Sequence, residues 1–210
     1  SSLKIRYLRG VTDISFSNFG DRIISSGVDG IVTVWDAFSA ENVYQLGTYV
    51  RRLITAVNYQ SYGNWRSQNM DFDELLETLY MRIAQHGSVL DIDLSPDGVH
   101  LATVSEDGMV KIWELSNRLA PVLIINQDAF SVEYSPDGNH LAIGSRDGVV
   151  GIFDVKDGRE LVSLYGHSGA IFDLAFTPQG YLISVGEDKI VRIWDPTPSE
   201  ELFHLINKYP

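Results

Sequence analysis

The sequence predicts an all-β fold built from small antiparallel sheets that repeat along the chain. Four segments are copies of one another, and their last residues are Asp36, Glu114, Asp154 and Asp195. The same turn of each copy is marked by an aspartate, at Asp29, Asp107, Asp147 and Asp188, which gives intervals of 78, 40 and 41 residues. A fixed period is the signature of a repeat architecture, and 78 is close to two periods. We therefore expect one degenerate or shortened repeat between the first two copies.

Each copy has the pattern of strand, turn and strand. In the last copy, the alternating residues Ile171, Leu174 and Phe176 precede a Pro-x-Gly turn, and two further apolar strands flank the aspartate turn. Similar turns interrupt the other copies, as SNFG at 17–20 and SPDG at 95–98 and 135–138. Period-two alternation between such turns is typical of short antiparallel strands. One more strand follows in each unit, for example at 161–164 and 202–206, and four antiparallel strands in about 40 residues form a β-propeller blade.

The strongest signal is a dipeptide that closes the copies. Trp-Asp stands at 35–36 and 194–195, becomes Trp-Glu at 113–114 and Phe-Asp at 153–154, and Gly-His opens the last copy at 166–167. With these marks the chain resembles the WD-repeat family of β-propellers. The resemblance implies one propeller domain over 1–210, with four clear four-stranded blades and one degenerate or shortened blade. The repeats expected are 10–46, degenerate 47–80, 86–125, 126–165 and 166–207.

The resemblance also implies a hydrogen-bonded chain inside each complete repeat, made by an opening His, a Ser or Thr, the turn Asp and the Trp. The last repeat carries all four, as His167, Ser184, Asp188 and Trp194. Partial sets are Ser25, Asp29 and Trp35 in the first repeat and Thr103, Asp107 and Trp113 in the second. We interpret all ten residues as structural. In the third repeat Ile143 and Phe153 replace the polar partners, so we expect it to rely more on apolar packing.

The number of blades leaves two alternatives. WD-repeat propellers usually close with seven blades of about 40 residues, which is more chain than the 210 residues present. Five blades are arithmetically possible if the segment after the first repeat forms one, although Leu75, Leu79 and Ile83 lie at helical spacing and favour a short helix at 72–84. The other alternative is an incomplete seven-bladed ring, because strands of the last type are expected at both 3–8 and 201–207. Its open edges would promote association.

Composition narrows the classes of partner. The chain has 44% apolar residues, no cysteine and a net charge of −12. It contains no membrane-length apolar run and no secretory signal, so we expect a cytoplasmic protein. An acidic surface repels phosphate backbones, which argues against direct nucleic-acid binding and favours a basic protein segment. A solvated face that keeps the chain in solution explains the same charge.

Catalytic and metal-binding patterns are weak. Asp91, Asp93, Ser95 and Asp97 superficially resemble a calcium loop, but Ala102 stands where such a loop needs its last glutamate. The five histidines have no metal-binding spacing, and neither a Gly-x-Ser-x-Gly elbow nor a phosphate-binding glycine loop occurs. We therefore expect no catalytic residues, no cofactor and no metal site.

The resemblance implies where a partner would dock. Members of the family commonly use the loop face, through one residue early in the first strand and one just before the turn aspartate. The matching positions are Thr12, Val28, Leu90, Glu106, Phe130, Arg146, Phe172 and Glu187. Phe130 and Phe172 are equivalent in neighbouring repeats, and with Glu106 and Glu187 beside them they could hold an apolar anchor next to a Lys or Arg. Burial of both phenylalanines in the core is the alternative interpretation.

The sequence thus favours a non-enzymatic scaffold that docks protein or peptide partners on the loop face of the propeller. A second hypothesis comes from the third repeat, which also resembles TolB-like and peptidase-associated propellers, where the propeller would gate a hydrolase domain in a longer chain. A third is the sensor domain of a larger signalling protein. Further blades of the same or a larger chain are additional candidate partners.

Overall fold

The computed structural model describes residues 10–17, 19–46, 87–116 and 120–195. These residues form fifteen β-strands and no helix, which confirms the all-β prediction. The expected degenerate repeat at 47–80, the alternative helix at 72–84 and the terminal strands at 3–8 and 201–207 lie outside the described residues. Within the described part of the chain, no helix is long and apolar enough to cross a membrane.

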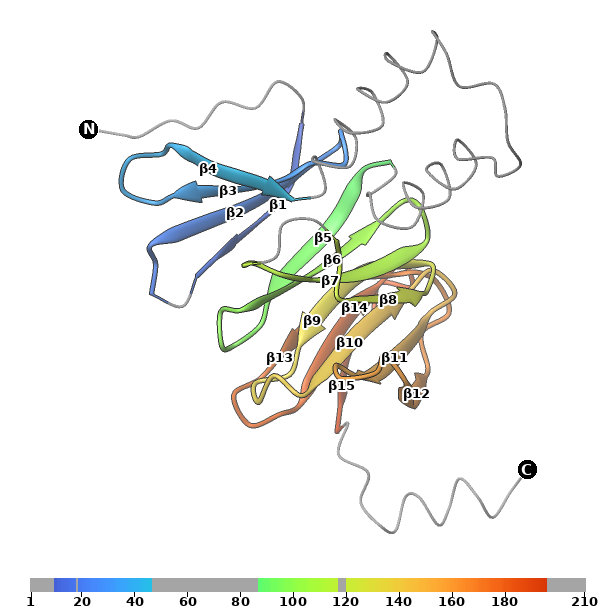
Figure 1. Ribbon diagram of the computed structural model, residues 1–210. Helices are drawn as coiled ribbons and strands as arrows, with labels where there is room; N and C mark the ends of the chain where they lie inside the picture. Colours follow the sequence, from blue (N-terminus) through green and yellow to red (C-terminus); the bar gives the residue numbers. More distant parts are fainter. Residues whose placement is uncertain (1–9, 18, 47–86, 117–119, 196–210) are drawn as a thin grey trace, which may run out of the picture. The chain divides into compact units, whose positions relative to one another are not determined.

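The chain divides into two compact units, Ser1–Asp128 and Ala129–Pro210. The first unit contains two four-stranded antiparallel sheets, each made of consecutive strands (Figure 1). One sheet comprises β1 (Val11–Phe16), β2 (Arg22–Gly27), β3 (Val32–Asp36) and β4 (Asn42–Leu46). The other comprises β5 (Val89–Leu94), β6 (His100–Ser105), β7 (Met109–Glu114) and β8 (Leu123–Asn126).

The second unit has the same organisation. Its first sheet comprises β9 (Ala129–Tyr134), β10 (His140–Ser145), β11 (Val149–Asp154) and β12 (Glu160–Tyr165). Its second sheet comprises β13 (Ile171–Phe176), β14 (Leu182–Gly186) and β15 (Val191–Trp194). A fourth strand of this last sheet was expected at 202–206, beyond the described residues. The four sheets match four blades of a WD-repeat propeller, and the single propeller domain over 1–210 stays a prediction.

The turn between the first two strands of a sheet is determined by local hydrogen bonds. In the SPDG turn of the second sheet, the Ser95 hydroxyl donates to Asp97 Oδ1 at 2.5 Å and accepts from the His100 N–H at 2.9 Å. Gly98 has a φ of 72°, which few other residues adopt without strain. The same bonds recur at Ser135 and Asp137 in the third sheet. The repeated sequence therefore encodes a repeated hairpin.

Each unit has an apolar core, which holds its two sheets together. In the first unit, Val89, Ile92 and Leu94 of β5 pack in one cluster with Ile24 and Val34 of the preceding sheet. The β1–β4 and β5–β8 sheets are therefore direct neighbours, although the segment 47–86 separates them in sequence.

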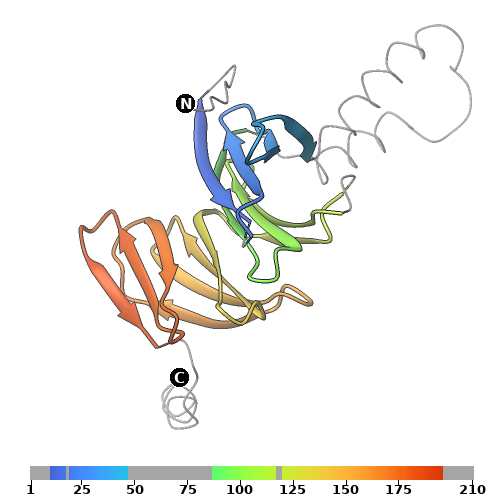
Figure 2. The same cartoon turned by 90° about the vertical axis from the view of Figure 1, so that its left-hand side faces the viewer.

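In the second unit, Ile171 and Leu174 of β13 cluster with Val150 and Ile152 of the β9–β12 sheet. The two sheets of this unit lie side by side in the ribbon view (Figure 2). A Cβ atom at Gly144 would lie 2.7 Å from a methyl carbon of Ile171, so the absent side chain permits the close approach of the two sheets.

Candidate functional site

The first strand of every sheet carries a register shift near its start. In β13, Ile171 pairs with Gly186 and Asp173 pairs with Val185, so Phe172 is an extra residue without a partner in the ladder. The extra residues of the four sheets are Thr12, Leu90, Phe130 and Phe172. They are the four first-strand positions predicted for docking. A β-bulge bends its strand and redirects the side chain of the extra residue, a device that is frequent beside functional sites.

The second set of predicted positions lies at the same end of the sheets. Val28, Glu106, Arg146 and Glu187 are all exposed, and each precedes a turn aspartate. The turn is tied to the loop before the first strand, because the N–H of Val28 donates to the Gly10 carbonyl and that of Glu187 donates to the Ala170 carbonyl. Glu106 makes the equivalent bond to Ser88. In the first, second and last sheets, this bond places the residue before the turn aspartate at the same end of the sheet as the extra residue of the first strand.

An aromatic patch forms at this end of the second unit, and we define it as Phe130, Arg146 and Phe172. The rings of Phe130 and Phe172 meet edge to face, with centroids 6.0 Å apart and planes at 67°. The guanidinium carbon of Arg146 lies 4.2 Å from the Phe130 centroid. Edge-to-face pairing and cation–π stacking each contribute about 0.5–1 kcal/mol at such sites. Phe172 keeps 55% of its surface exposed, so the patch offers an aromatic ring to the outside.

Glu187 lies in the β14–β15 turn and contacts the loop that precedes β13. A Cβ atom at Gly169 would be 3.0 Å from both the Cβ and the Oε2 atom of Glu187, so this side chain rests against the glycine. Its carboxylate supplies a negative charge within the same unit as the aromatic patch. Glu187 and Phe172 sit on the two segments, the β14–β15 turn and the start of β13, that the Glu187 N–H to Ala170 bond joins.

Two of the corresponding positions in the first unit are polar side chains that already make local hydrogen bonds. Thr12 Oγ1 is hydrogen-bonded to Ser26 Oγ at 2.8 Å, and the Ser88 N–H donates to Glu106 Oε2 at 3.0 Å. Because these polar atoms serve local bonds, they offer less to a partner than Phe172 does. The predicted placement of Glu106 beside the two phenylalanines concerns residues of different units and stays a prediction.

A hydrogen-bonded chain crosses the last sheet below this end. His167 Nδ1 is 2.9 Å from Asp188 Oδ1, His167 Nε2 is 2.7 Å from Ser184 Oγ, and Trp194 Nε1 donates to the same Ser184 oxygen at 2.8 Å. In the tautomer with the proton on Nδ1, the imidazole donates to the carboxylate and Nε2 accepts the Ser184 hydroxyl proton. The stabilising role of this chain remains a prediction.

The environment of Asp188 favours its ionised form. Burial acts to raise the pKa of Asp188, but hydrogen bonds from His167 and from the N–H groups of Ile190 and Ser168 outweigh it and hold the pKa below its usual value. The turn aspartate of the last sheet is therefore an anion bound by three donors.

The first two sheets contain shorter versions of this chain. Trp35 Nε1 donates to Ser25 Oγ at 2.6 Å, and Trp113 Nε1 donates to Thr103 Oγ1 at 3.0 Å. Asp29 accepts the Ile31 N–H at 3.2 Å and so closes its own turn. The tryptophan of each sheet is thereby joined to the second strand.

The second sheet holds a polar pair that sequence reasoning missed. Lys111 Nζ donates to Asp107 Oδ2 at 2.9 Å, and the Lys111 side chain is fully buried. Burial lowers the pKa of Lys111, and the hydrogen bond and charge of Asp107 oppose that shift. A lysine inside the otherwise apolar strand MVKIWE, four residues after an aspartate, is the signal that could have revealed the pair.

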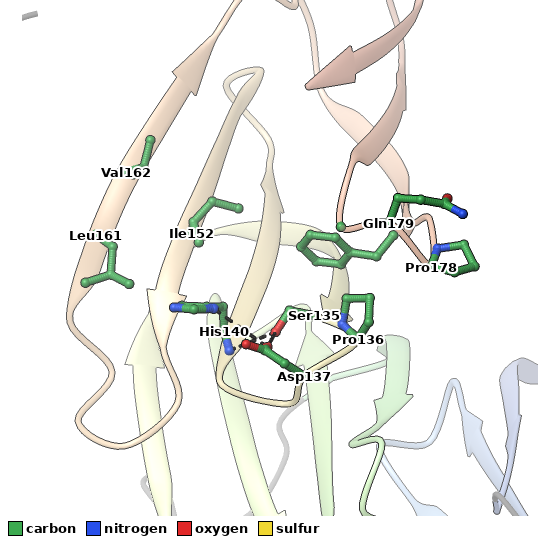
Figure 3. A pocket seen from close by; sticks show the side chains of 11 residues that line it. Ser135, Pro136, Asp137, His140, Ile152, Leu161, Val162, Pro178 and Gln179 are labelled. Carbon is green, nitrogen blue, oxygen red and sulfur yellow. Dashed lines mark hydrogen bonds and ion pairs between the residues drawn. The ribbon is translucent and has the colours of Figure 1, made fainter. Parts of the chain in front are cut away.

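A cavity of about 380 Å³ opens at the opposite end of β9 and β13 (Figure 3). Ile152, Val162 and Phe176 form apolar walls, and the two turns that follow β9 and β13 form its rim. Asp137 on the rim is already hydrogen-bonded by Ser135 and Asn139, which lower its pKa to about 2. Because the Asp137 oxygens are already hydrogen-bonded within the turn, they are less available to bind a ligand in the cavity. The aromatic patch is therefore the stronger candidate site.

Metal ligands are not gathered in the described structure. Across residues 10–17, 19–46, 87–116 and 120–195, no three His, Asp or Glu side chains converge as a metal site would require.

Comparison with known proteins gives the family. The family model "WD domain, G-beta repeat" matches residues 5–36, 77–114, 125–154 and 158–195. Protein HIR1 of Candida albicans is 24% identical over 190 residues, which cover 90% of this chain and 18% of that protein. Protein hir1 of Aspergillus terreus is 32% identical over 107 residues, 50% of this chain and 8% of that protein.

A relative from another organism also matches only part of its own length. An uncharacterized WD repeat-containing protein of Synechocystis is 29% identical over 115 residues, which cover 52% of this chain and 32% of that protein. The chain thus spans about a third or less of the length of these relatives. Each of the four family matches contains the first three strands of one sheet, and together they cover more than half of the residues, so the chain belongs to the WD-repeat family.

Proposed function

We propose that this chain is a non-enzymatic interaction module that docks a protein or peptide segment at the loop end of its first strands, with the aromatic patch as the main contact. One observation carries the proposal. Phe130 and Phe172 are both extra residues of β-bulges, they contact each other, and Phe172 still exposes 55% of its surface. Family membership supports the coarser conclusion, because WD-repeat chains serve as interaction scaffolds rather than as enzymes.

The chemistry of the patch indicates the kind of segment. An apolar side chain of the partner would pack on the exposed ring of Phe172, since aromatic anchors dominate interface energetics. The Arg146 guanidinium stacks on the Phe130 ring, so the cation is part of the proposed docking surface. A Lys or Arg next to the anchor would pair with Glu187. The net charge of −12 would further speed association with a basic segment.

The remaining predicted positions, Thr12, Val28, Leu90 and Glu106, would form a docking surface of the first unit. Val28 exposes 45% of its surface and could contribute an apolar contact. The relatives named HIR1 and the WD repeat-containing relative give no support to a propeller that gates a hydrolase. A cytoplasmic location stays a prediction.

A binding screen with two variants tests the proposal. The probes are 12-residue peptides that carry one Leu or Phe followed by Lys or Arg, and each has a control in which Glu replaces the basic residue. We expect wild-type protein to bind a subset of basic peptides, and Phe172→Ala to weaken that binding at least tenfold while lowering Tm by no more than about 2–4 °C. Phe38→Ala is the matched control, because Phe38 is 75% exposed in the β3–β4 turn.

Two outcomes would refute the proposal. If Phe172→Ala lowers Tm by many degrees, the ring is a packing residue and the patch is core. If wild-type protein binds none of the peptides, or binds the acidic controls equally well, the aromatic patch is not the docking site described.

A further inference from the structure

Six Asp-Gly pairs occur in the sequence, at 29–30, 97–98, 107–108, 137–138, 147–148 and 157–158. Each lies in the connection between two strands of one sheet. Such a pair is reactive, because glycine lacks the side chain that would keep its amide nitrogen away from the carboxyl carbon of the preceding aspartate. The reaction needs a protonated carboxyl group that is free to move, so the fold decides which pair can react.

In four of the pairs, a serine two residues before the aspartate holds the carboxylate. The hydroxyl donors are Ser95 for Asp97, Ser105 for Asp107, Ser135 for Asp137 and Ser145 for Asp147. Each of these carboxylates also accepts the N–H of the residue two positions later. The serine hydroxyl is the largest cause that lowers the pKa of Asp97, and it lowers the pKa of Asp137 to about 2 together with Asn139. All four carboxylates are therefore held in place, and these two are also kept ionised.

The pairs at Asp29 and Asp157 lack this serine, since glycine and valine stand two residues before them. Asp29 is half-buried, and its turn is tied to the loop before β1 by the bond from the Val28 N–H to the Gly10 carbonyl. Asp157 is exposed in the β11–β12 connection. Within the described structure its carboxylate accepts one hydrogen bond, from the Arg159 N–H at 3.0 Å. Of the six aspartates, Asp157 is therefore the exposed one whose carboxylate is least restrained.

The product also needs room, because isoaspartate adds one carbon to the main chain. At Asp147 there is none, since a Cβ atom at Gly148 would lie 2.8 Å from the His167 carbonyl oxygen. The β11–β12 connection differs, because strand pairing is already irregular between Ile152 and Phe153 just before it. The strand that follows, β12, is at the edge of its sheet. An extra main-chain carbon in this connection displaces an edge strand at most.

We propose that Asp157 and Gly158 form a modification site at which the main chain rearranges to isoaspartate. The Gly158 nitrogen bonds to the Asp157 Cγ carbon, and the amide proton leaves with the carboxyl hydroxyl as water, which gives a cyclic succinimide. Water then adds to one of the two ring carbonyls. Opening at Cγ restores aspartate, and opening at the main-chain carbonyl carbon gives isoaspartate. One water is released and one consumed, and no oxidation state changes.

The fold has to open locally for this reaction. The Gly158 N–H donates to the Asp154 carbonyl at 2.9 Å, and this bond must break before the nitrogen can attack. Opening of an exposed hairpin connection costs less free energy than global unfolding. The free α-carboxylate of the product is the group that isoaspartyl methyltransferases methylate, so the chain becomes a substrate of that class of enzyme. The site is independent of peptide docking.

Peptide mapping of the full 210-residue chain tests the proposal. Folded protein is incubated at pH 6, labelled by a protein isoaspartyl methyltransferase with radioactive S-adenosylmethionine, and digested, and electron-transfer fragmentation locates isoaspartate at each pair. We expect isoaspartate at 157 to accumulate at least about fivefold faster than at any other pair, because the other five are more firmly held. The same incubation in guanidinium chloride is the reference. There the restraints are lost, and the six rates should agree within about threefold.

Two variants separate the chemistry from the restraint. Asp157→Glu keeps the charge but moves the carboxyl group one methylene away, so attack would form a larger and less favourable ring, and the label at 157 should disappear. Ser135→Ala removes the hydroxyl that holds the exposed Asp137 carboxylate. It should raise isoaspartate formation at 137 at least about threefold and leave the rate at 157 unchanged. Circular dichroism and thermal melts establish that both variants are folded.

Three results would overturn the proposal. A folded chain that gains no isoaspartate at 157, while the denatured chain does, would show that the β11–β12 connection protects the pair. Faster reaction at any other pair of the folded chain would show that exposure and carboxylate bonds do not select the site. The same preference for 157 in guanidinium chloride would assign the selectivity to neighbouring side chains and not to the fold.

Discussion

Lys111 Nζ donates a hydrogen bond to Asp107 Oδ2 across 2.9 Å, and the two side chains are 0% and 8% exposed. A buried ion pair is at best weakly stabilising as a whole, but removing one member leaves an uncompensated charge and costs about 3–5 kcal/mol. In the last sheet the equivalent aspartate, Asp188, is bound by His167 instead. The turn aspartate is thus bound by a lysine in the second sheet and by a histidine in the last sheet.

The Asp107→Asn substitution should therefore destabilise the protein strongly. It leaves the Lys111 ammonium buried without a counter-charge, and we expect a loss of about 3 kcal/mol in the free energy of unfolding, measured with urea. Lys111→Met should cost less, because Asp107 keeps its bonds from the Ser105 hydroxyl and the Met109 N–H. Asp29→Asn is the control at the equivalent turn of the first sheet. Equal losses for Asp107→Asn and Asp29→Asn would contradict the assigned role of the pair.

The turn of the third sheet should give a pH-dependent contribution to stability. Hydrogen bonds from Ser135 and Asn139 lower the pKa of Asp137 from 3.8 to about 2. A carboxyl group with a depressed folded pKa stabilises the protein above its unfolded pKa, and the contribution is lost as pH falls through the folded value.

The difference in Tm between wild type and Asp137→Asn should therefore be constant above about pH 5 and shrink between about pH 4 and pH 2. Thermal melts across pH 2–6 measure it. A difference that stays constant over the whole range would show that ionisation of Asp137 contributes nothing to stability.

The hydrogen-bonded chain of the last sheet predicts an unequal effect of two equivalent substitutions. Ser184 Oγ lies between His167 Nε2 and Trp194 Nε1, so Ser184→Ala leaves a buried imidazole nitrogen and a partly buried indole N–H without this partner. We expect it to cost about 2–4 kcal/mol, since each unsatisfied group costs about 1–3 kcal/mol. Ser25→Ala removes the acceptor of the Trp35 indole N–H but no bond to a histidine of its own repeat, because the first repeat contains no histidine, and it should cost less. Urea unfolding compares them, and similar losses would argue against a contribution from His167.

Much of the fold was predictable because its determinants are local. The Ser135–Asp137 turn bonds lie within five residues, and the alternation of Ile171, Leu174 and Phe176 specifies a strand whatever surrounds it. The docking positions could be named from the repeat, but their bulges could not, because a bulge depends on how two strands pair. For the same reason the contact of Arg146 with Phe130 was not foreseen.

The burial of individual side chains could not be predicted, because it depends on which sheets pack against each other. Ile14 and Ile92 hold the same place in the repeat, yet one is 52% exposed and the other 4%. Nothing in the two strand sequences distinguishes them, since burial is decided by the neighbouring sheet. The structure packs the β1–β4 sheet directly on β5, and the degenerate repeat that the interval of 78 residues predicts between the first two copies lies outside the described residues and stays a prediction. Sequence spacing counts residues along the chain and does not determine which sheets touch.

The charge at Glu187 should determine which peptides bind. Glu187 is exposed and lies on the turn that is tied to the start of β13, so it would pair with a basic residue placed beside an anchor on Phe172. We expect Glu187→Arg to weaken binding of the basic peptides about tenfold and to strengthen binding of their acidic controls, measured by fluorescence anisotropy. Both effects should diminish between 50 mM and 500 mM salt, because partly exposed charges are screened.

Glu160→Arg is the matched control, because it makes the same change of net charge on the exposed outer strand β12. If attraction between the whole acidic chain and the peptide were responsible, both substitutions would weaken binding equally. A selective effect of Glu187→Arg requires a local contact, since a contribution from net charge alone does not depend on position. Equal effects of the two substitutions would therefore remove Glu187 from the docking surface while leaving the aromatic contact at Phe172 to be judged by its own variant.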